Sequence, residues 1–263
     1  MPEITSTGGT LHYEMSGSGD PVMLISGLSG NGSGWGGQIA TFAEAFSTIV
    51  PDHPGTGSSS EPSNGYEVAN HAADMAELIR QLDCGPTHIV GSSTGGAIAQ
   101  VMALDHPDVV RSITMASSWA RCDDFFRHQF AVRKQTLLEQ GIAAYADLTA
   151  LFLYSPAYLR SNYADVRAWC DMVATRGARA EIMAARIDMI MRHDQYDRLA
   201  DIAVPSLVLV GRDDFCTPVH LSEEVASLIP VAELAVLEGG HLIYKESPAA
   251  FFGRVTEFLS KVP

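Results

Sequence analysis

Residues 87–96 read Thr-His-Ile-Val-Gly-Ser-Ser-Thr-Gly-Gly and lead directly into Ala-Ile-Ala-Gln-Val-Met-Ala-Leu at 97–104. The first four residues are typical of a buried β-strand, and the second run is typical of a helix. Between them, Gly91, Ser93 and Gly95 form Gly-x-Ser-x-Gly on a sharp strand-to-helix turn. Such a turn brings the residues two before and two after the serine close together, so only small residues fit there. The stretch predicts that Ser93 presents its hydroxyl at the carboxyl end of a sheet, where open α/β sheets bind ligands.

The pattern is weak evidence when taken alone. A chain of this length shows Gly-x-Ser-x-Gly by chance about one time in ten at ordinary glycine and serine content. The alternative is a glycine-rich turn with an incidental serine, so the interpretation depends on partners elsewhere in the chain.

Short β-branched runs alternate with amphipathic stretches along most of the chain, which indicates a largely parallel sheet with helices on both faces. The expected strands lie at 11–14, 22–26, 48–51, 87–91, 112–116, 206–211 and 233–237. The expected helices lie at 38–46, 66–82, 94–104, 220–228 and 248–259.

Residues 117–203 break this alternation, because they are helix-rich and contain no convincing strand. We predict a core domain at 1–116 and 204–263, with 117–203 inserted as a helical cap. Of the 17 Lys and Arg, 11 lie between Arg121 and Arg198, against 10 of the 31 Asp and Glu, so this part of the cap is near +1 and the rest of the chain near −15. Most of these arginines are expected on solvated helix faces. One or two of these arginines could instead face the cleft and bind a carboxylate of the substrate.

Composition excludes several classes of function. A net charge of −14 argues against nucleic acid and anionic membrane as partners, because both repel an acidic surface. The N-terminus lacks a basic stretch followed by an apolar run, and no apolar run approaches the roughly 20 residues of a membrane span. The four cysteines are scattered, which predicts free thiols. With no P-loop, His-Glu-x-x-His or strand-linked Gly-x-Gly-x-x-Gly, we expect no cofactor and no metal. We therefore expect a soluble, cytoplasmic protein that acts on a small molecule. The sequence does not decide between a monomer and a homodimer.

A serine hydroxyl needs an oriented histidine as base and an acid that holds the histidine. His241 follows Gly239-Gly240 directly after the expected strand at 233–237. The acid is expected after the strand at 206–211, where Asp213 and Asp214 compete. Asp214 is favoured because it falls in Gly-x-x-Asp-x-x-x-Pro at 211–218, and Asp213 stays the alternative. The three groups then follow the chain order Ser, Asp, His, each after its own strand.

Acyl transfer also needs donors aimed at the oxyanion. We expect one at the backbone N–H of Thr94, directly after the nucleophile. The second is assigned to the N–H of Leu28, in the glycine-rich loop after the strand at 22–26, with Gly27 beside it at the substrate. A flexible loop without a role is the alternative.

These motifs resemble the α/β-hydrolase superfamily along nearly the whole chain. They are the Ser26-Gly27-Leu28 loop, Asp52-His53-Pro54-Gly55-Thr56-Gly57-Ser58, the Gly91–Gly95 turn, the Asp214 loop and Gly-Gly-His241. The resemblance implies an α/β-hydrolase fold with a mostly parallel eight-stranded sheet. Two departures stand out: many members have His-Gly where this chain has Ser26-Gly27, and Arg-Gly-His-Gly where it has residues 54–57. Neither removes a backbone donor.

A closer resemblance is to the aminoacrylate hydrolase and 3-oxoadipate enol-lactonase branch. It is carried by residues 24–35, by the start of the cap at 119–133 and by Leu-Phe-Leu-Tyr at 151–154. It implies catabolic chemistry on small polar or carboxylated compounds. Trp119 and Tyr154 are then candidate substrate contacts, although aromatic residues in a cap also serve simply as packing.

The residues favour a serine hydrolase that cleaves a small ester, lactone, or amide- or enamine-like bond through an acyl-enzyme on Ser93. Two alternatives stay open. One is carbon–carbon bond hydrolysis of the meta-cleavage-product type, whose enzymes also carry Gly-Arg-Asp-Asp before the acid. The other is a ligand receptor that retains the triad.

Overall fold

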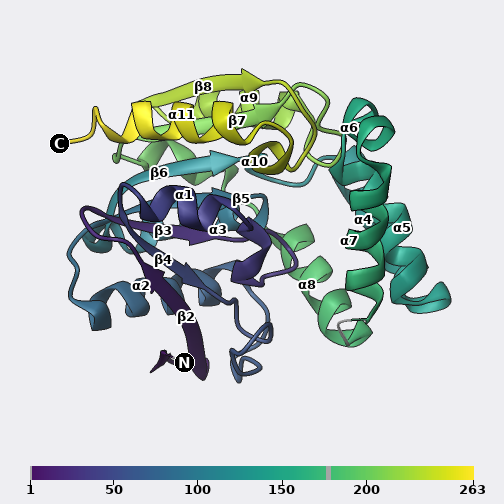
Figure 1. The fold of residues 1–263 in the computed structure, drawn as a ribbon. Coiled ribbons are helices and arrows are strands. Elements are labelled where there is room, and N and C mark those ends of the chain that lie inside the picture. Colours follow the sequence, from purple (N-terminus) through teal and green to yellow (C-terminus); the bar gives the residue numbers. More distant parts are fainter. Residues whose placement is uncertain (1, 176–178) are drawn as a thin grey trace.

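One mixed sheet organises the protein (Figure 1). The structure, a computed structural model, describes residues 2–175 and 179–263. Within them eight strands pair in the order β1-β2-β4-β3-β5-β6-β7-β8. β1 and β2 pair antiparallel with their neighbours, and the others run parallel. The predicted mostly parallel, eight-stranded α/β fold is confirmed. The strands are β1 (Glu3–Thr5), β2 (Thr10–Ser16), β3 (Pro21–Ile25), β4 (Ser47–Pro51), β5 (Thr87–Ser92), β6 (Val110–Ala116), β7 (Ser206–Gly211) and β8 (Ala232–Leu237).

Alternating side chains along the strands bury both faces of the sheet. In β3, Met23 and Ile25 belong to the apolar cluster shared with α2, α3 and α9. Val22 and Leu24 point to the opposite face, where they pack with α1 and α11. Two-sided burial explains why these strands read as nearly continuous apolar runs. The helices on the two faces are α1 (Gln38–Ala43), α2 (Val68–Leu82), α3 (Thr94–Asp105), α9 (Val219–Leu228) and α11 (Pro248–Leu259).

Apart from shifts of one or two residues at the ends of elements, the sheet region differs from the expectations in three places. The predicted helix at 38–46 ends at Ala43, because the chain must turn before β4 begins at Ser47. β1 and the one-turn helix α10 (Ile243–Glu246) were not predicted. Elements of three and four residues are too short to show a hydrophobic period.

A set of five helices lies between β6 and β7, in the stretch where the sequence predicted an insertion. Figure 1 shows them beside the end of the sheet toward which the strand arrows point. We call residues 124–192 the helical segment. Its members are α4 (Asp124–Gln140), α5 (Ile142–Leu153), α6 (Pro156–Ser161), α7 (Tyr163–Thr175) and α8 (Ala180–Arg192).

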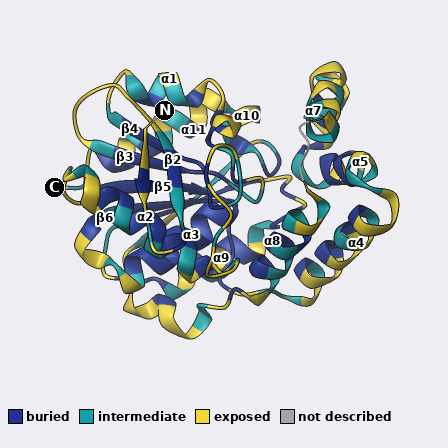
Figure 2. Cartoon of the chain, turned by 90° about the horizontal axis from the view of Figure 1, so that it is seen from below, coloured by how far each residue is buried: buried dark blue, intermediate teal, exposed yellow. Residues whose placement is uncertain are grey.

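The helical segment is packed into the main core rather than resting on it. Buried Phe126 of α4 and Ile187 of α8 belong to the same apolar cluster as Met23 of the sheet. Figure 2 shows the buried faces of α4 and α8 turned inward, toward the sheet. The division into two domains at 117 and 203 stays a prediction. None of the helices in the described ranges is both long and apolar enough to cross a bilayer.

Alanine substitutions at two helical glycines should change the free energy of unfolding in opposite directions. A Cβ at Gly95, in the first turn of α3, would run into the carbonyls of Ile25 and Ser26. A Cβ at Gly253, in the middle of α11, would meet no atom within 4 Å. Gly253→Ala should raise the free energy of unfolding by roughly 0.5–1 kcal/mol, since alanine loses less backbone entropy in a helix. Gly95→Ala should lower it, and urea unfolding of both variants provides the measurement. A destabilised Gly253→Ala, or an unaffected Gly95→Ala, would contradict this account.

Candidate active site

Ser93 lies on a strained turn between β5 and α3. Its φ of 54° and ψ of −115° fall in the left-handed half of backbone space, which a residue other than glycine adopts only at a cost. Hydrogen bonds to the next strand hold the turn: Ser93 N–H donates to the Ala116 carbonyl at 2.7 Å, and Ser118 Oγ donates to the Ser93 carbonyl at 3.1 Å. A Cβ at Gly91 would run into the backbone of Gly95. The steric reason for both glycines, expected from the sequence, is therefore present.

His241 reaches the same place from the loop after β8. Gly239 has a φ of +125°, and a Cβ at Gly240 would lie 2.6 Å from the Ser155 nitrogen. Glu246 holds the loop, because its carboxylate accepts from Gly240 N–H at 3.0 Å. The glycines before His241 thus let the loop bend tightly beneath the helical segment.

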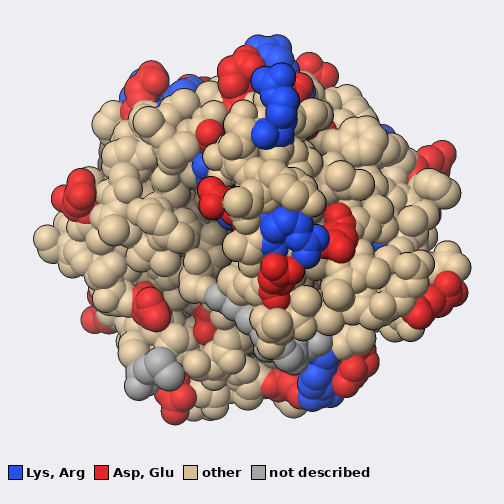
Figure 3. All heavy atoms as spheres, turned by 45° about the vertical axis from the view of Figure 1, so that its right-hand side comes forward, with Lys and Arg blue, Asp and Glu red and all other residues tan. Residues whose placement is uncertain are grey.

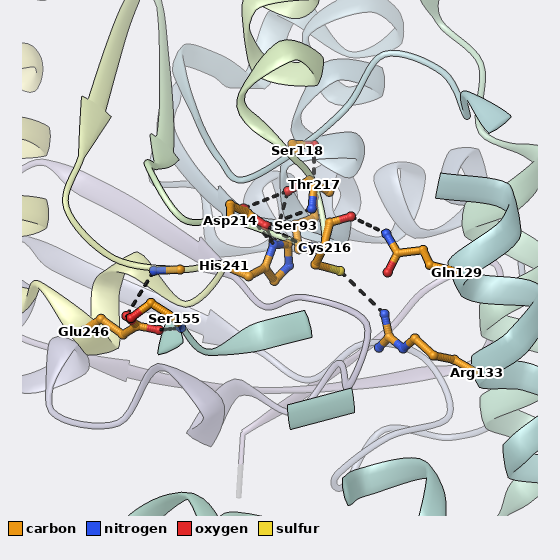
Figure 4. Close-up of polar contacts among 11 residues, drawn as sticks. Ser93, Ser118, Gln129, Arg133, Ser155, Asp214, Cys216, Thr217, His241 and Glu246 are labelled. Carbon is orange, nitrogen blue, oxygen red and sulfur yellow. Dashed lines mark hydrogen bonds and ion pairs between the residues drawn. The ribbon is translucent and has the colours of Figure 1, made fainter. Parts of the chain in front are cut away.

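Asp214 is the aspartate that meets His241, and Asp213 is exposed. Nδ1 of His241 lies 3.0 and 3.1 Å from the two carboxylate oxygens of Asp214. The carboxylate also accepts from the N–H groups of Cys216 at 2.9 Å and Thr217 at 2.8 Å, and from Thr217 Oγ1 at 2.9 Å (Figure 4). These bonds fix the carboxylate in one orientation. Sequence analysis missed Thr217, since a hydroxyl three residues after an aspartate is common in any loop.

The buried charge of Asp214 controls the protonation of His241. Burial by itself lowers the pKa of an imidazole, but the adjacent carboxylate outweighs it and raises the pKa of His241. The pair therefore stabilises an imidazolium, which is the form that arises when a base takes a proton. The structure has no hydrogen bond between the Ser93 hydroxyl and the His241 ring; such contacts are often long until a ligand binds.

A cavity of about 1060 Å³ opens onto these groups. Ser93 and His241 line it together with Gly27 and Leu28. A Cβ at Gly27 would lie only 3.3 Å from the Ser93 Cβ, so the loop after β3 passes directly over the serine. Thr94 is the first residue of α3, and its N–H therefore lacks an acceptor within the helix.

Arg186, from α8, holds the loop after β3 in place and was not identified from the sequence. Its buried guanidinium donates to the carbonyls of Leu28 at 2.9 Å and Pro54 at 3.1 Å, and to Nδ1 of His53 at 2.9 Å. Burial and the Arg186 charge hold the pKa of His53 well below its usual value, so this ring is a neutral acceptor. Among several arginines in the helical segment, no local signal marks the one that reaches this loop.

Trp119 and Tyr154 are packing residues in the structure. Both are almost completely buried, and neither is among the described residues that line the cavity. Trp119 packs on Phe126 with ring centroids 4.6 Å apart. The Tyr154 hydroxyl accepts from Lys245 Nζ at 3.0 Å. Of the two interpretations open for these aromatic residues, their positions favour packing.

The candidate site consists of a serine, a histidine and an aspartate, without an assembled metal site. Within the described residues no three His, Cys, Asp or Glu side chains are placed to hold a metal ion. The four cysteines are free thiols, and Cys216 lies beside His241.

Comparison with known proteins identifies the family of the chain. The family model described as the alpha/beta hydrolase fold matches residues 20–248. The chain is 33% identical, over all of its length and 99% of the relative's, to a protein of Azorhizobium caulinodans named "Putative carbamate hydrolase RutD". A protein of the same name from Caulobacter vibrioides is 31% identical, with 95% of each chain covered.

Solved structures give the same result. A thermophilic esterase from Thermogutta terrifontis, with malate bound, superposes with a TM-score of 0.87 at 27% identity and covers 99% of this chain and 98% of its own. An enol-lactonase from Burkholderia xenovorans has a TM-score of 0.89 at 23% identity, covering 99% of this chain and 100% of its own, and shows the fold. The resemblance to the α/β-hydrolase superfamily expected from the sequence is confirmed.

The Asp214–His241 pair predicts a measurable shift in titration. Asp214→Asn removes the charge that stabilises the imidazolium, so the pKa of His241 should fall. Asp213→Asn, one residue away on the exposed side of the loop, should leave it unchanged. Titration of the histidine ring protons by NMR distinguishes the two variants. A His241 pKa that is the same in Asp214→Asn and wild type would contradict the assignment.

Proposed function

The chain belongs to the α/β-hydrolase family, and we propose that it is a serine hydrolase in which Ser93, His241 and Asp214 form the catalytic triad. The observation that carries the proposal is the buried Asp214–His241 pair beside Ser93 on its strained turn, at one cavity. Hydrolase names among the relatives support the reaction class.

In the proposed mechanism, the Ser93 hydroxyl attacks an acyl carbon while Nε2 of His241 takes its proton. Asp214 accepts the hydrogen bond from Nδ1 throughout and stabilises the imidazolium. The imidazolium then gives its proton to the leaving group, and an acyl-enzyme forms on Ser93. Water, deprotonated by His241, releases the acyl group and restores the serine.

The N–H groups of Leu28 and Thr94 are the proposed oxyanion donors. Thr94 N–H lies at the N-terminus of α3, where the helix dipole also favours negative charge. Leu28 belongs to the loop that passes over Ser93, and its carbonyl is held by Arg186. Gly27 contributes the close approach, because a side chain there would crowd the serine.

The proposed substrates are small acyl compounds that are polar or carboxylated. Esters, lactones, carbamates and amide- or enamine-like bonds all react through the same tetrahedral intermediate. The carbamate hydrolase name of the RutD relatives and the malate bound to a related esterase support this class. A cavity of about 1060 Å³ holds molecules of this size.

Loss of the nucleophile or base should abolish hydrolysis. Ser93→Ala and His241→Ala should each lower kcat on p-nitrophenyl esters by about 10⁴-fold or more without unfolding the protein. A fluorophosphonate probe should label wild type and not Ser93→Ala, as read by mass spectrometry. Wild-type turnover in either folded variant would refute the triad. Failure to label Ser93, with no turnover on esters, lactones, carbamates or ring-cleavage diketones, would support a ligand receptor instead.

Arg186→Met should reduce kcat by roughly 10- to 100-fold and change KM little, because the Leu28 donor then loses its support at the transition state. Arg127→Met, at an exposed position of α4, is the matched control and should retain wild-type kinetics. Urea unfolding separates a loss of folded enzyme from a loss of kcat. An Arg186→Met enzyme with unchanged kcat would show that the loop holds its position without this side chain.

A further inference from the structure

Basic side chains are over-represented on the wall of the cavity. Its lining in the described residues contains one carboxylate, Glu61, against four basic side chains: Arg133, Arg179, Arg186 and Lys245. In a chain of net charge −14, this local excess of positive charge is opposite in sign to the whole. The cavity is therefore suited to an anionic ligand.

Most of the described basic side chains at the surface of residues 121–198 have carboxylate partners. Lys134 pairs with Asp188 at 2.6 Å, and Arg192 pairs with Glu67 at 2.6 Å. Figure 3 views the side of the molecule where this segment lies, and basic and acidic side chains are neighbours there. The excess positive charge predicted for the segment is thus largely neutralised at the surface.

Three of the four cavity residues are also accounted for. Arg179 is exposed and pairs with Glu61 and with Glu181. Arg186 donates to two carbonyls and one histidine nitrogen. Lys245 is more exposed than Arg133 and donates to a tyrosine hydroxyl, and partial burial lowers the pKa of its ammonium.

Arg133, from α4, is only 2% exposed and, like Arg186, has no carboxylate within 4.0 Å among the described residues. It differs from Arg186 in its hydrogen bonds, because those of Arg186 are 2.9–3.1 Å long. The N–H···O contacts of Arg133 are long, at 3.3 Å to Thr149 Oγ1 and 3.4 Å to Tyr145 Oη, and its third contact is to Cys216 Sγ at 3.5 Å. N–H···O bonds are normally 2.7–3.2 Å long, and a thiol is a weak acceptor. A buried guanidinium stays charged, and leaving it without a counter-ion is costly.

The surroundings hold this charge in a fixed orientation. The guanidinium carbon lies 4.3 Å from the centre of the Phe130 ring, so one face is stacked on an aromatic ring. Its edge points toward Cys216, which in turn lies beside His241 (Figure 4). Arg133 also lines the cavity, so its guanidinium borders the cavity on the side of the proposed catalytic base. A planar carboxylate is the ligand that the fork of guanidinium N–H groups binds in bidentate fashion.

We infer that Arg133 is the receptor for a carboxylate of the substrate, so that the preferred substrates are small acyl compounds with a free carboxylate near the scissile bond. The inference deepens the proposed hydrolase function and rests on it for the identity of the bond cleaved. The substrate carboxylate would be the counter-ion of the Arg133 guanidinium, for which the described residues provide no carboxylate. Burial of the guanidinium strengthens that attraction relative to a surface ion pair.

A purely structural role for Arg133 would be to join α4 to the loop that carries Asp214. That link already exists, because Gln129 of α4 donates to the Cys216 carbonyl. A methionine at position 133 would keep the apolar stem on Phe130 and remove the charge together with its three hydrogen bonds. If Arg133 is only a structural link, its loss should affect charged and neutral substrates equally. If it is the carboxylate receptor, its loss should affect mainly the charged substrate.

The kinetic test uses a matched pair of esters, p-nitrophenyl hemisuccinate and its methyl ester, which differ in one negative charge. Wild type should prefer the hemisuccinate in kcat/KM by about 10-fold or more. Arg133→Met should reduce that ratio by about 10- to 100-fold, the scale of a charge-assisted pair, and Arg133→Lys should restore part of it. Arg127→Met on the same helix, and Lys245→Met on the same cavity, should keep the wild-type ratio. A wild-type ratio near one, or a ratio lost in Lys245→Met and kept in Arg133→Met, would overturn the inference.

A binding measurement separates this inference from the proposed catalytic function. Calorimetry should detect succinate binding to Ser93→Ala, and the additional change Arg133→Met should weaken that binding by about 10-fold or more. Equal succinate affinity in the two proteins would overturn the carboxylate receptor while leaving the serine mechanism intact. Ester turnover by folded Ser93→Ala, with binding that still depends on Arg133, would refute the mechanism and retain the receptor.

Discussion

The close approach of three backbone segments around Ser93 is the constraint on which the rest of the site depends. The β5–α3 turn places Ser93 at a positive φ, and the loop after β3 crosses directly above it. Side chains at Gly27, Gly91 or Gly95 would force these segments apart. Because the three segments touch, one turn fixes the hydroxyl, the N-terminus of α3 and the proposed oxyanion loop relative to one another. The cost of the strained serine is met by the packing of a sheet that is buried on both faces.

The helical segment is tied to each of the loops that form the site. Arg186 of α8 donates to the Leu28 carbonyl in the loop after β3. Gln129 of α4 donates to the Cys216 carbonyl in the Asp214 loop. Ser155, between α5 and α6, donates to the same Glu246 carboxylate that holds the histidine loop. A displacement of these helices would therefore strain several hydrogen bonds at once, which couples the shape of the cavity to the geometry of the reacting groups.

Local patterns were sufficient where the chain repeats a physical rule over several residues. Seven of the eight strands and the helices α1, α2, α3, α9 and α11 follow from hydrophobic runs. The positions of Ser93, Asp214 and His241 follow from glycine- and proline-marked loops after strands. β1 and α10 were too short to show a pattern. Thr217, Arg133 and Arg186 carry no such mark, because each acts through contacts with residues far away in the sequence. Trp119 and Tyr154 show the converse: aromatic residues stand out in a sequence, but their positions in the fold are those of packing residues.

Hydrophobic period and glycine placement are local properties, so they predict the α/β class, the strand-to-helix turn at Ser93 and the residue types of the proposed triad. Only the folded chain shows which aspartate meets His241, which buried arginine supports the Leu28 loop and which one has long N–H···O contacts. Those distinctions depend on burial and on distances between residues as far apart as Leu28 and Arg186. A charge is counted in a sequence, but only the fold determines whether water, a carboxylate or an incoming ligand must neutralise it.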